Sequence, residues 1–170
     1  MSGIFLVLNN NFSLKKEKKY LESANLIKHR GNQNLIIKDF GYGKLFFHRL
    51  KTENSQEQPY HDENIITVID GEIYNSHELA KDLDIEIKNI KNINLIIAKL
   101  YKKHGEEFFS KLNGMFSILI IDLIKKKIIA CKDKLGLKPF FYYKNKDFFI
   151  LSSEAKSIIN CTEDTKIDYQ

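Results

Sequence analysis

The chain has 170 residues but only two cysteines, two prolines and no tryptophan. Cys131 and Cys161 stand far apart, so the sequence holds neither a disulfide framework nor paired metal-binding cysteines. We expect no metal and a reducing, cytoplasmic setting. Apolar runs such as Phe116–Ile121 are far too short to span a bilayer. The first residues lack a signal-peptide pattern, and we expect no membrane partner.

The charges have one dominant sign, with a formal net charge of +5 and a sequence pI of about 9.0. A basic surface is one feature of nucleic-acid-binding proteins. The abundance of Lys, Ile and Asn is also what an AT-rich genome produces, so we expect no nucleic-acid partner. Hydrophobic residues make up 43% and charged residues 29%, a globular balance that fits a single domain over 1–170.

Arginine is scarce, because Arg30 and Arg49 are the only two among 27 basic residues. A guanidinium can hold a carboxylate through two parallel hydrogen bonds, and a lysine cannot. The two arginines therefore indicate positions at which Lys would fail. The alternatives are chance placement, a sheet-edge salt bridge for Arg49, and an anchor at the end of a helix for Arg30.

The hydrophobic pattern predicts clustered strands with helices between the clusters. Strands are expected over 3–8, 35–40, 44–49, 65–69, 116–122, 127–132, 140–143 and 148–152. Helices are expected over 14–29, 76–83, 94–104, 106–112 and 153–159. Asp70-Gly71 has the composition of a turn. Strands that cluster instead of alternating with helices favour an α+β fold with two antiparallel sheets.

The sequence lacks the common cofactor motifs. It has no phosphate-binding loop, no dinucleotide-binding glycine pattern and no paired histidines on a helix. We expect no cofactor.

Seven collinear segments together resemble one family, the class II (N-terminal-nucleophile) glutamine amidotransferase domain at the front of asparagine synthetases. The likeness covers nearly the whole chain. The segments are Met1-Ser2-Gly3-Ile4-Phe5, His29-Arg30-Gly31, His48-Arg49-Leu50 with Gln58-Pro59, Asp70-Gly71-Glu72-Ile73-Tyr74-Asn75 with Glu78-Leu79, Leu112-Asn113-Gly114-Met115-Phe116, Asp133-Lys134-Leu135-Gly136-Leu137-Lys138-Pro139, and Ser153-Glu154-Ala155-Lys156.

The resemblance implies a four-layer αββα N-terminal-nucleophile hydrolase sandwich with two antiparallel sheets. In this family, removal of the start methionine frees residue 2, whose side chain attacks the amide of glutamine while its α-amine serves as base. The resemblance implies that Ser2, Asp70 and Gly71 occupy the catalytic positions. It assigns Arg49, Leu50, Glu72 and Ile93 to substrate binding, with Arg49 on the α-carboxylate of glutamine.

The chain departs from the family at three of these positions. Ser2 stands where the family has a cysteine nucleophile, and Asp70 stands where it has the asparagine of the oxyanion hole. Ile93 aligns with the aspartate that binds the α-ammonium of glutamine, although a shift of one residue would place Asn92 or Asn94 there. Ser2 alone could be a serine that merely follows the start methionine, or an engineered exchange. Three departures at three separate roles favour natural decay of the activity.

Nothing in the sequence resembles the ATP-binding synthetase half of these enzymes. We therefore expect an asparagine-synthetase-like amidotransferase domain, ancestrally a glutaminase, with glutamine as its substrate and weak or lost activity. The alternative is a pseudo-glutaminase that acts as a structural or docking domain for a separate synthetase chain.

Overall fold

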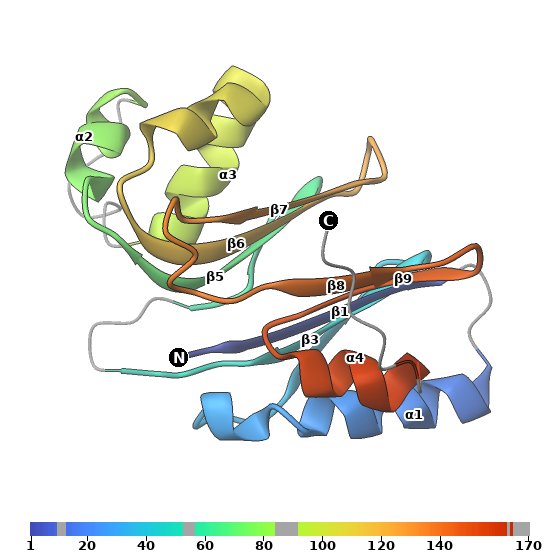
Figure 1. The fold of residues 1–170 in the computed structure, drawn as a ribbon. Coiled ribbons are helices and arrows are strands. Elements are labelled where there is room, and N and C mark those ends of the chain that lie inside the picture. Colours follow the sequence, from blue (N-terminus) through green and yellow to red (C-terminus); the bar gives the residue numbers. More distant parts are fainter. Residues whose placement is uncertain (10–12, 53–56, 84–91, 163, 165–170) are drawn as a thin grey trace. The chain divides into compact units, whose positions relative to one another are not determined.

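The structure is a computed structural model that describes residues 1–9, 13–52, 57–83, 92–162 and 164. The chain forms two compact units (Figure 1). The first unit comprises Met1–Leu50 with Phe140–Gln170, and the second comprises Lys51–Pro139. Among the described residues, no helix is both long and apolar enough to cross a membrane.

The first unit is built on a five-stranded antiparallel sheet in the order β2-β3-β1-β9-β8. Its strands are β1 (Gly3–Asn9), β2 (Ile36–Asp39), β3 (Gly43–His48), β8 (Phe141–Lys144) and β9 (Phe148–Ser152). Its helices are α1 (Leu14–Asn25), the short 3-10 helix η1 (Lys28–Arg30) and α4 (Ala155–Thr162).

Helices α1 and α4 lie side by side against one face of this sheet (Figure 1). Phe5 and Val7 of β1 share a buried apolar cluster with Ala24 of α1 and Ile158 of α4. Alternate residues of a strand face opposite sides of a sheet, so Ile4 and Leu6 point away from the helices. All four of these β1 residues are fully buried, which explains why the segment is a continuous apolar run. β1 is therefore the rigid centre of the unit.

The second unit contains a four-stranded antiparallel sheet in the order β4-β5-β6-β7. Its strands are β4 (Tyr60–His61), β5 (Ile65–Ile73), β6 (Gly114–Asp122) and β7 (Lys127–Lys132). Its helices are α2 (Ser76–Lys81), α3 (Ile93–His104) and the 3-10 helix η3 (Gly105–Lys111). The expectation of two antiparallel sheets in an α+β fold is confirmed.

Helix α3 packs on one face of β5 and β6, as Figure 1 shows. Ile69 and Ile73 of β5 share a buried cluster with Ile118 of β6 and with Ile97 of α3. The helix ends where expected, at Gly105, whose φ of 62° suits a residue without a side chain.

The prediction of a turn at Asp70-Gly71 was wrong, because β5 runs straight through both residues to Ile73. Asp70 pairs with Ser117 of β6, and Gly71 pairs with Phe116. Gly71 has a φ of 126°, and a Cβ built on it would lie 2.0 Å from the carbonyl oxygen of Met115. The glycine therefore permits a close approach of two paired strands instead of a reversal of the chain.

The single helix expected over 14–29 is divided, since α1 ends at Asn25 and η1 follows. The N–H groups of Leu26 and Ile27 donate to the carbonyl oxygens three residues earlier, at 3.3 and 3.2 Å. This tighter winding is typical of a helix C-terminus. It carries the chain from α1 into η1, at whose end Arg30 is buried.

Candidate active site

Ser2 lies immediately before β1 and is only 5% exposed. Its Oγ accepts a hydrogen bond of 3.2 Å from the main-chain N–H of Leu50. The next residue, Gly3, pairs with His48 at the end of β3, so the two ends of these strands lie together. The first unit thus brings two of the expected site residues, Ser2 and Leu50, into direct contact, and Arg49 is the residue between β3 and Leu50.

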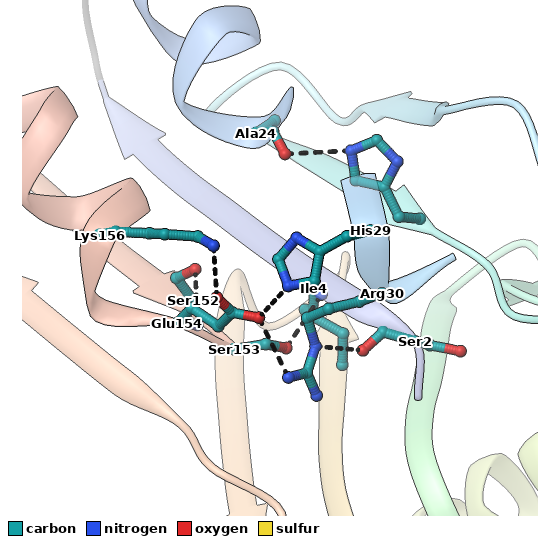
Figure 2. A network of polar contacts seen from close by, with 10 residues as sticks. Ser2, Ile4, Ala24, His29, Arg30, Ser152, Ser153, Glu154 and Lys156 are labelled. Atoms are coloured by element: carbon teal, nitrogen blue, oxygen red, sulfur yellow. Dashed lines mark hydrogen bonds and ion pairs between the residues drawn. The ribbon is translucent and has the colours of Figure 1, made fainter. Parts of the chain in front are cut away.

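Arg30 holds the main chain at residue 2, a role that the sequence did not predict. Its Nε donates to the carbonyl oxygen of Ser2 at 2.9 Å, and its Nη1 donates to Oε1 of Glu154 at 3.3 Å (Figure 2). Arg30 is 6% exposed. Only a guanidinium can bind two acceptors in different directions from fixed planar positions, so Lys would fail here.

Two glycines allow η1 and the ends of β1 and β3 to approach closely. A Cβ on Gly31 would lie 2.8 Å from the carbonyl oxygen of Arg49, and a Cβ on Gly3 would lie 3.1 Å from the carbonyl oxygen of Ile27. Asn32 adds a main-chain hydrogen bond of 3.0 Å to the carbonyl oxygen of Arg49. The backbone at Arg49 is therefore fixed from the side of η1.

His48 supports the same region as a neutral side chain. Burial lowers its pKa, because a charged imidazolium would lose its hydration. Its Nε2 lies 3.0 Å from the carbonyl oxygen of Ala24, so this nitrogen carries the hydrogen and donates it. His48 thus joins the end of β3 to α1.

Glu154, which lies just before α4, contacts three basic side chains. Its carboxylate lies 3.3 Å from Arg30, 2.9 Å from His29 and 2.9 Å from Lys156. Partial burial acts to raise its pKa, but the contacts with Lys156, Arg30 and His29 outweigh it and hold the pKa of Glu154 below its usual value. Glu154 is therefore ionised at neutral pH.

In the second unit, Asp70 is 2% exposed and belongs to β5. Ile69 and Ile73 face α3, so strand alternation directs the Asp70 side chain to the opposite face of the sheet, which Glu72 shares. An ionised carboxylate accepts hydrogen bonds and donates none. The resemblance implies an oxyanion hole with two donors, a side-chain amide at position 70 and the main-chain N–H of Gly71, and Asp70 lacks that amide.

Ile93 is the first residue of α3, and its side chain packs against the apolar cluster of the second unit. Neither neighbour supplies a charge. The Asn92 side chain caps the helix by accepting from the N–H of Leu95 at 3.1 Å, and Asn94 is fully buried. The start of α3 therefore lacks an anionic side chain in every register that the sequence leaves open.

The sequence contains signals for Arg30 and Glu154, although neither residue was assigned to the site from the sequence. Arg30 is one of two arginines in a lysine-rich chain, and Glu154 belongs to the Ser153-Glu154-Ala155-Lys156 segment. Neither signal shows that the two side chains meet, because they are 124 positions apart.

The comparisons with known proteins agree with this architecture. The model of a family described as "Glutamine amidotransferase domain" matches residues 28–160. The asparagine synthetases (glutamine-hydrolyzing) of Sandersonia aurantiaca and Asparagus officinalis are each 33% identical to this chain in an alignment of 164 residues that covers 93% of the chain. The chain spans only 31% and 28% of the lengths of these two relatives.

Two solved structures share the fold. Glutamine phosphoribosylpyrophosphate amidotransferase from B. subtilis matches with a TM-score of 0.67 and 18% identity, over 94% of this chain and 43% of that chain. A structure described as the allosteric regulatory enzyme of purine biosynthesis matches with a TM-score of 0.65 and 17% identity, over the same shares. The fold is that of the N-terminal-nucleophile amidotransferases. The chain belongs to the glutamine amidotransferase domain family, in the type found in asparagine synthetases.

Proposed function

We propose that this domain binds glutamine and is ancestrally a glutaminase that hydrolyses the side-chain amide through Ser2, and that this activity is now weak or lost. The observation that carries the proposal is the buried hydroxyl of Ser2, held by the N–H of Leu50 beside Arg49. A nucleophile needs such fixed placement. The guanidinium of Arg49 suits the α-carboxylate of glutamine, because it can bind both oxygens.

The reaction requires that Met1 be removed, because a peptide bond at residue 2 leaves no basic amine. The free α-amine, with a pKa of about 7.7–8.0, then takes the proton of the Ser2 hydroxyl as Oγ attacks the amide carbon. The amine returns this proton to the leaving nitrogen, and ammonia departs from the acyl-enzyme. Water resolves the ester to glutamate and restores the hydroxyl.

Three residues support weak turnover. Ser2 stays protonated near neutral pH, whereas a cysteine is partly thiolate. Asp70 has no amide N–H₂ where the family has an oxyanion-hole amide, and loss of one such donor costs about 10²–10³ in rate. Ile93 packs against apolar neighbours and offers no charge to the α-ammonium of glutamine.

A second candidate function is that of a pseudo-glutaminase, in which the fold persists as a structural or docking domain for a separate synthetase chain. Asp70 and Ile93 favour it, because Asp70 lacks the amide that the family uses in the oxyanion hole and Ile93 packs in an apolar cluster without the charge that would bind the α-ammonium of glutamine. Glutamine binding separates the two functions, since only the first requires it.

The test is glutaminase activity of the purified chain after intact-mass measurement shows that Met1 is absent. The triple variant Ser2→Cys, Asp70→Asn, Ile93→Asp is the matched comparison, and we expect it to raise turnover. The same triple variant with Arg49→Lys is the control, and we expect it to lose affinity for glutamine. No gain in the triple variant would contradict our assignment of these positions.

A further inference from the structure

We propose that Glu154 is a positioning residue that fixes residue 2 through Arg30. The inference rests on the proposed function, in which residue 2 is the nucleophile. Glu154 belongs to neither the catalytic nor the substrate-binding set that the family resemblance implies. Its carboxylate instead orients the guanidinium that holds the main chain of Ser2 (Figure 2).

The three groups form one connected path. The Nη1 of Arg30 donates to Oε1 of Glu154 at 3.3 Å, and the Nε of the same guanidinium donates to the carbonyl oxygen of Ser2 at 2.9 Å. Because the guanidinium is planar and rigid, an acceptor that fixes Nη1 also fixes the direction of Nε–H. The carboxylate therefore sets the direction of the hydrogen bond to Ser2.

The main chain next to Glu154 is hydrogen-bonded to β1, and these bonds restrain the position of the carboxylate. The Oγ of Ser153 accepts from the N–H of Ile4 at 3.0 Å, and the N–H of Ser153 donates to the carbonyl oxygen of Ile4 at 2.9 Å. The N–H of Glu154 donates to the Oγ of Ser152 at 3.2 Å. The segment that precedes α4 thus binds residue 4 directly and reaches residue 2 only through Arg30.

The two other basic side chains that contact Glu154, Lys156 and His29, are much more exposed than Arg30. Lys156 contacts Oε2, the oxygen that Arg30 does not use, and its side chain is 48% exposed. His29 shares Oε1 and is 55% exposed. Exposed ion pairs contribute little, whereas the Arg30 side chain is 5% exposed. We therefore expect the contact with Arg30, the least exposed of the three basic side chains, to carry the positioning effect.

The experiment measures the accessibility of residue 2 directly. In a chain with Ser2→Cys, the rate of iodoacetamide alkylation is followed at each thiol by peptide mass spectrometry, with the same N-terminal processing in every sample. Cys161 on α4 and Cys131 in the second unit are half-buried and serve as internal controls. Adding Glu154→Gln should raise the high-pH plateau rate at position 2 by about tenfold, because a charged hydrogen bond that restrains the site is weakened. The plateau rate at high pH reports how accessible the thiol is. A change in the thiol pKa shifts only the pH at which the alkylation rate is half of that plateau.

Two further variants test the path. Lys156→Gln removes a contact with the same carboxylate, and we expect the rate at position 2 to remain within about twofold. Arg30→Lys should raise the rate as Glu154→Gln does, and the two together should do no more than either alone, since residues that act through one contact are not additive.

An unchanged plateau at position 2, or an equal rise at Cys161, overturns the proposal, because the second result would mean that Glu154 only stabilises α4. Additive effects of Arg30→Lys and Glu154→Gln also overturn it. Glutamine hydrolysis is measured on the same samples. If the plateau responds as expected while no variant hydrolyses glutamine, the positioning role stands and the proposed function fails.

Discussion

The main-chain N–H of Leu50 donates a hydrogen bond of 3.2 Å to the hydroxyl oxygen of Ser2. Leu50 follows β3 and Ser2 precedes β1, so this contact joins the two chain segments just beyond the paired ends of these neighbouring strands. In this contact the Ser2 oxygen acts as the acceptor, as a hydroxyl oxygen can.

This contact predicts that Ser2→Ala destabilises the fold as well as removing the proposed nucleophile. The substitution leaves the N–H of Leu50 without its acceptor, which costs about 1–2 kcal/mol. Urea unfolding measures the loss as a lower midpoint at constant slope. Ser110→Ala removes an exposed hydroxyl and is the matched control, for which we expect a change within about 0.5 kcal/mol. Equal effects of the two substitutions would contradict the structural role of Ser2.

The close approach of the two strands at Gly71 predicts a much larger loss of stability for Gly71→Ala than for Ser2→Ala. A Cβ at this position would lie 2.0 Å from the carbonyl oxygen of Met115, and the φ of 126° is one that L-residues avoid. Gly71→Ala should therefore cost about 3 kcal/mol or more, or prevent folding, because the main chains of β5 and β6 must separate. Thermal unfolding followed by circular dichroism measures the effect.

Gly41 provides the control for that experiment. It has a φ of 86°, but a Cβ there meets nothing within 4 Å. Gly41→Ala should cost only about 1 kcal/mol, the penalty for a left-handed backbone alone. A similar cost at Gly41 and Gly71 would show that backbone conformation, and not the close strand approach, is the constraint at Gly71.

Tyr101 predicts a loss of stability at alkaline pH. Its hydroxyl donates to Oδ2 of Asp122 at 3.0 Å, and burial together with this carboxylate raises the pKa of Tyr101 to about 12. An unfolded tyrosine has a pKa of about 10. The stabilisation is therefore complete below pH 10 and is lost as the pH rises toward 12, because the unfolded state releases its proton first.

The measurement compares the wild-type chain with Tyr101→Phe by urea unfolding from pH 8 to pH 12. At pH 8 the variant should be less stable by about 1–2 kcal/mol, since the hydrogen bond from Tyr101 to Asp122 is lost. The difference should shrink above pH 10. A difference that stays constant up to pH 12 would contradict the raised pKa of Tyr101.

Local patterns predicted most of the fold. Apolar runs and turn residues located the described strands except the short β4, and Gly105 marked the end of α3, because these features depend on neighbours in the sequence. The pattern failed at Asp70-Gly71, which has the composition of a turn but pairs with Ser117 and Phe116 of β6, which lie 47 and 45 residues further along the chain. A local sequence pattern carries no information about strand partners so far along the chain. The partner strand decides whether a glycine reverses the chain or allows two strands to approach closely.

The candidate site was predictable only in part, for the same reason. The resemblance pointed to Ser2 and Leu50, and the structure joins them. The resemblance gave no indication that Arg30 donates a hydrogen bond to the main chain of Ser2. The helical pattern instead suggested that Arg30 anchors the end of a helix. The break of α1 at Asn25 and the tight winding that follows redirect Arg30 toward β1. Such a redirection depends on tertiary packing and not on helix propensity.

Asp70 gives the sharpest functional prediction. In a chain with Ser2→Cys and with Met1 removed, adding Asp70→Asn should raise glutaminase turnover by about 10²–10³, because the amide N–H₂ becomes a donor to the developing oxyanion. The gain should appear in kcat with little change in KM, since the donor acts on the transition state more than on bound glutamine. Asp70→Ala is the matched control, for it removes the carboxylate without adding a donor. An equal gain from Asp70→Ala would mean that repulsion by the carboxylate, and not the missing donor, limits the reaction, and no gain from either variant would exclude Asp70 from the oxyanion position.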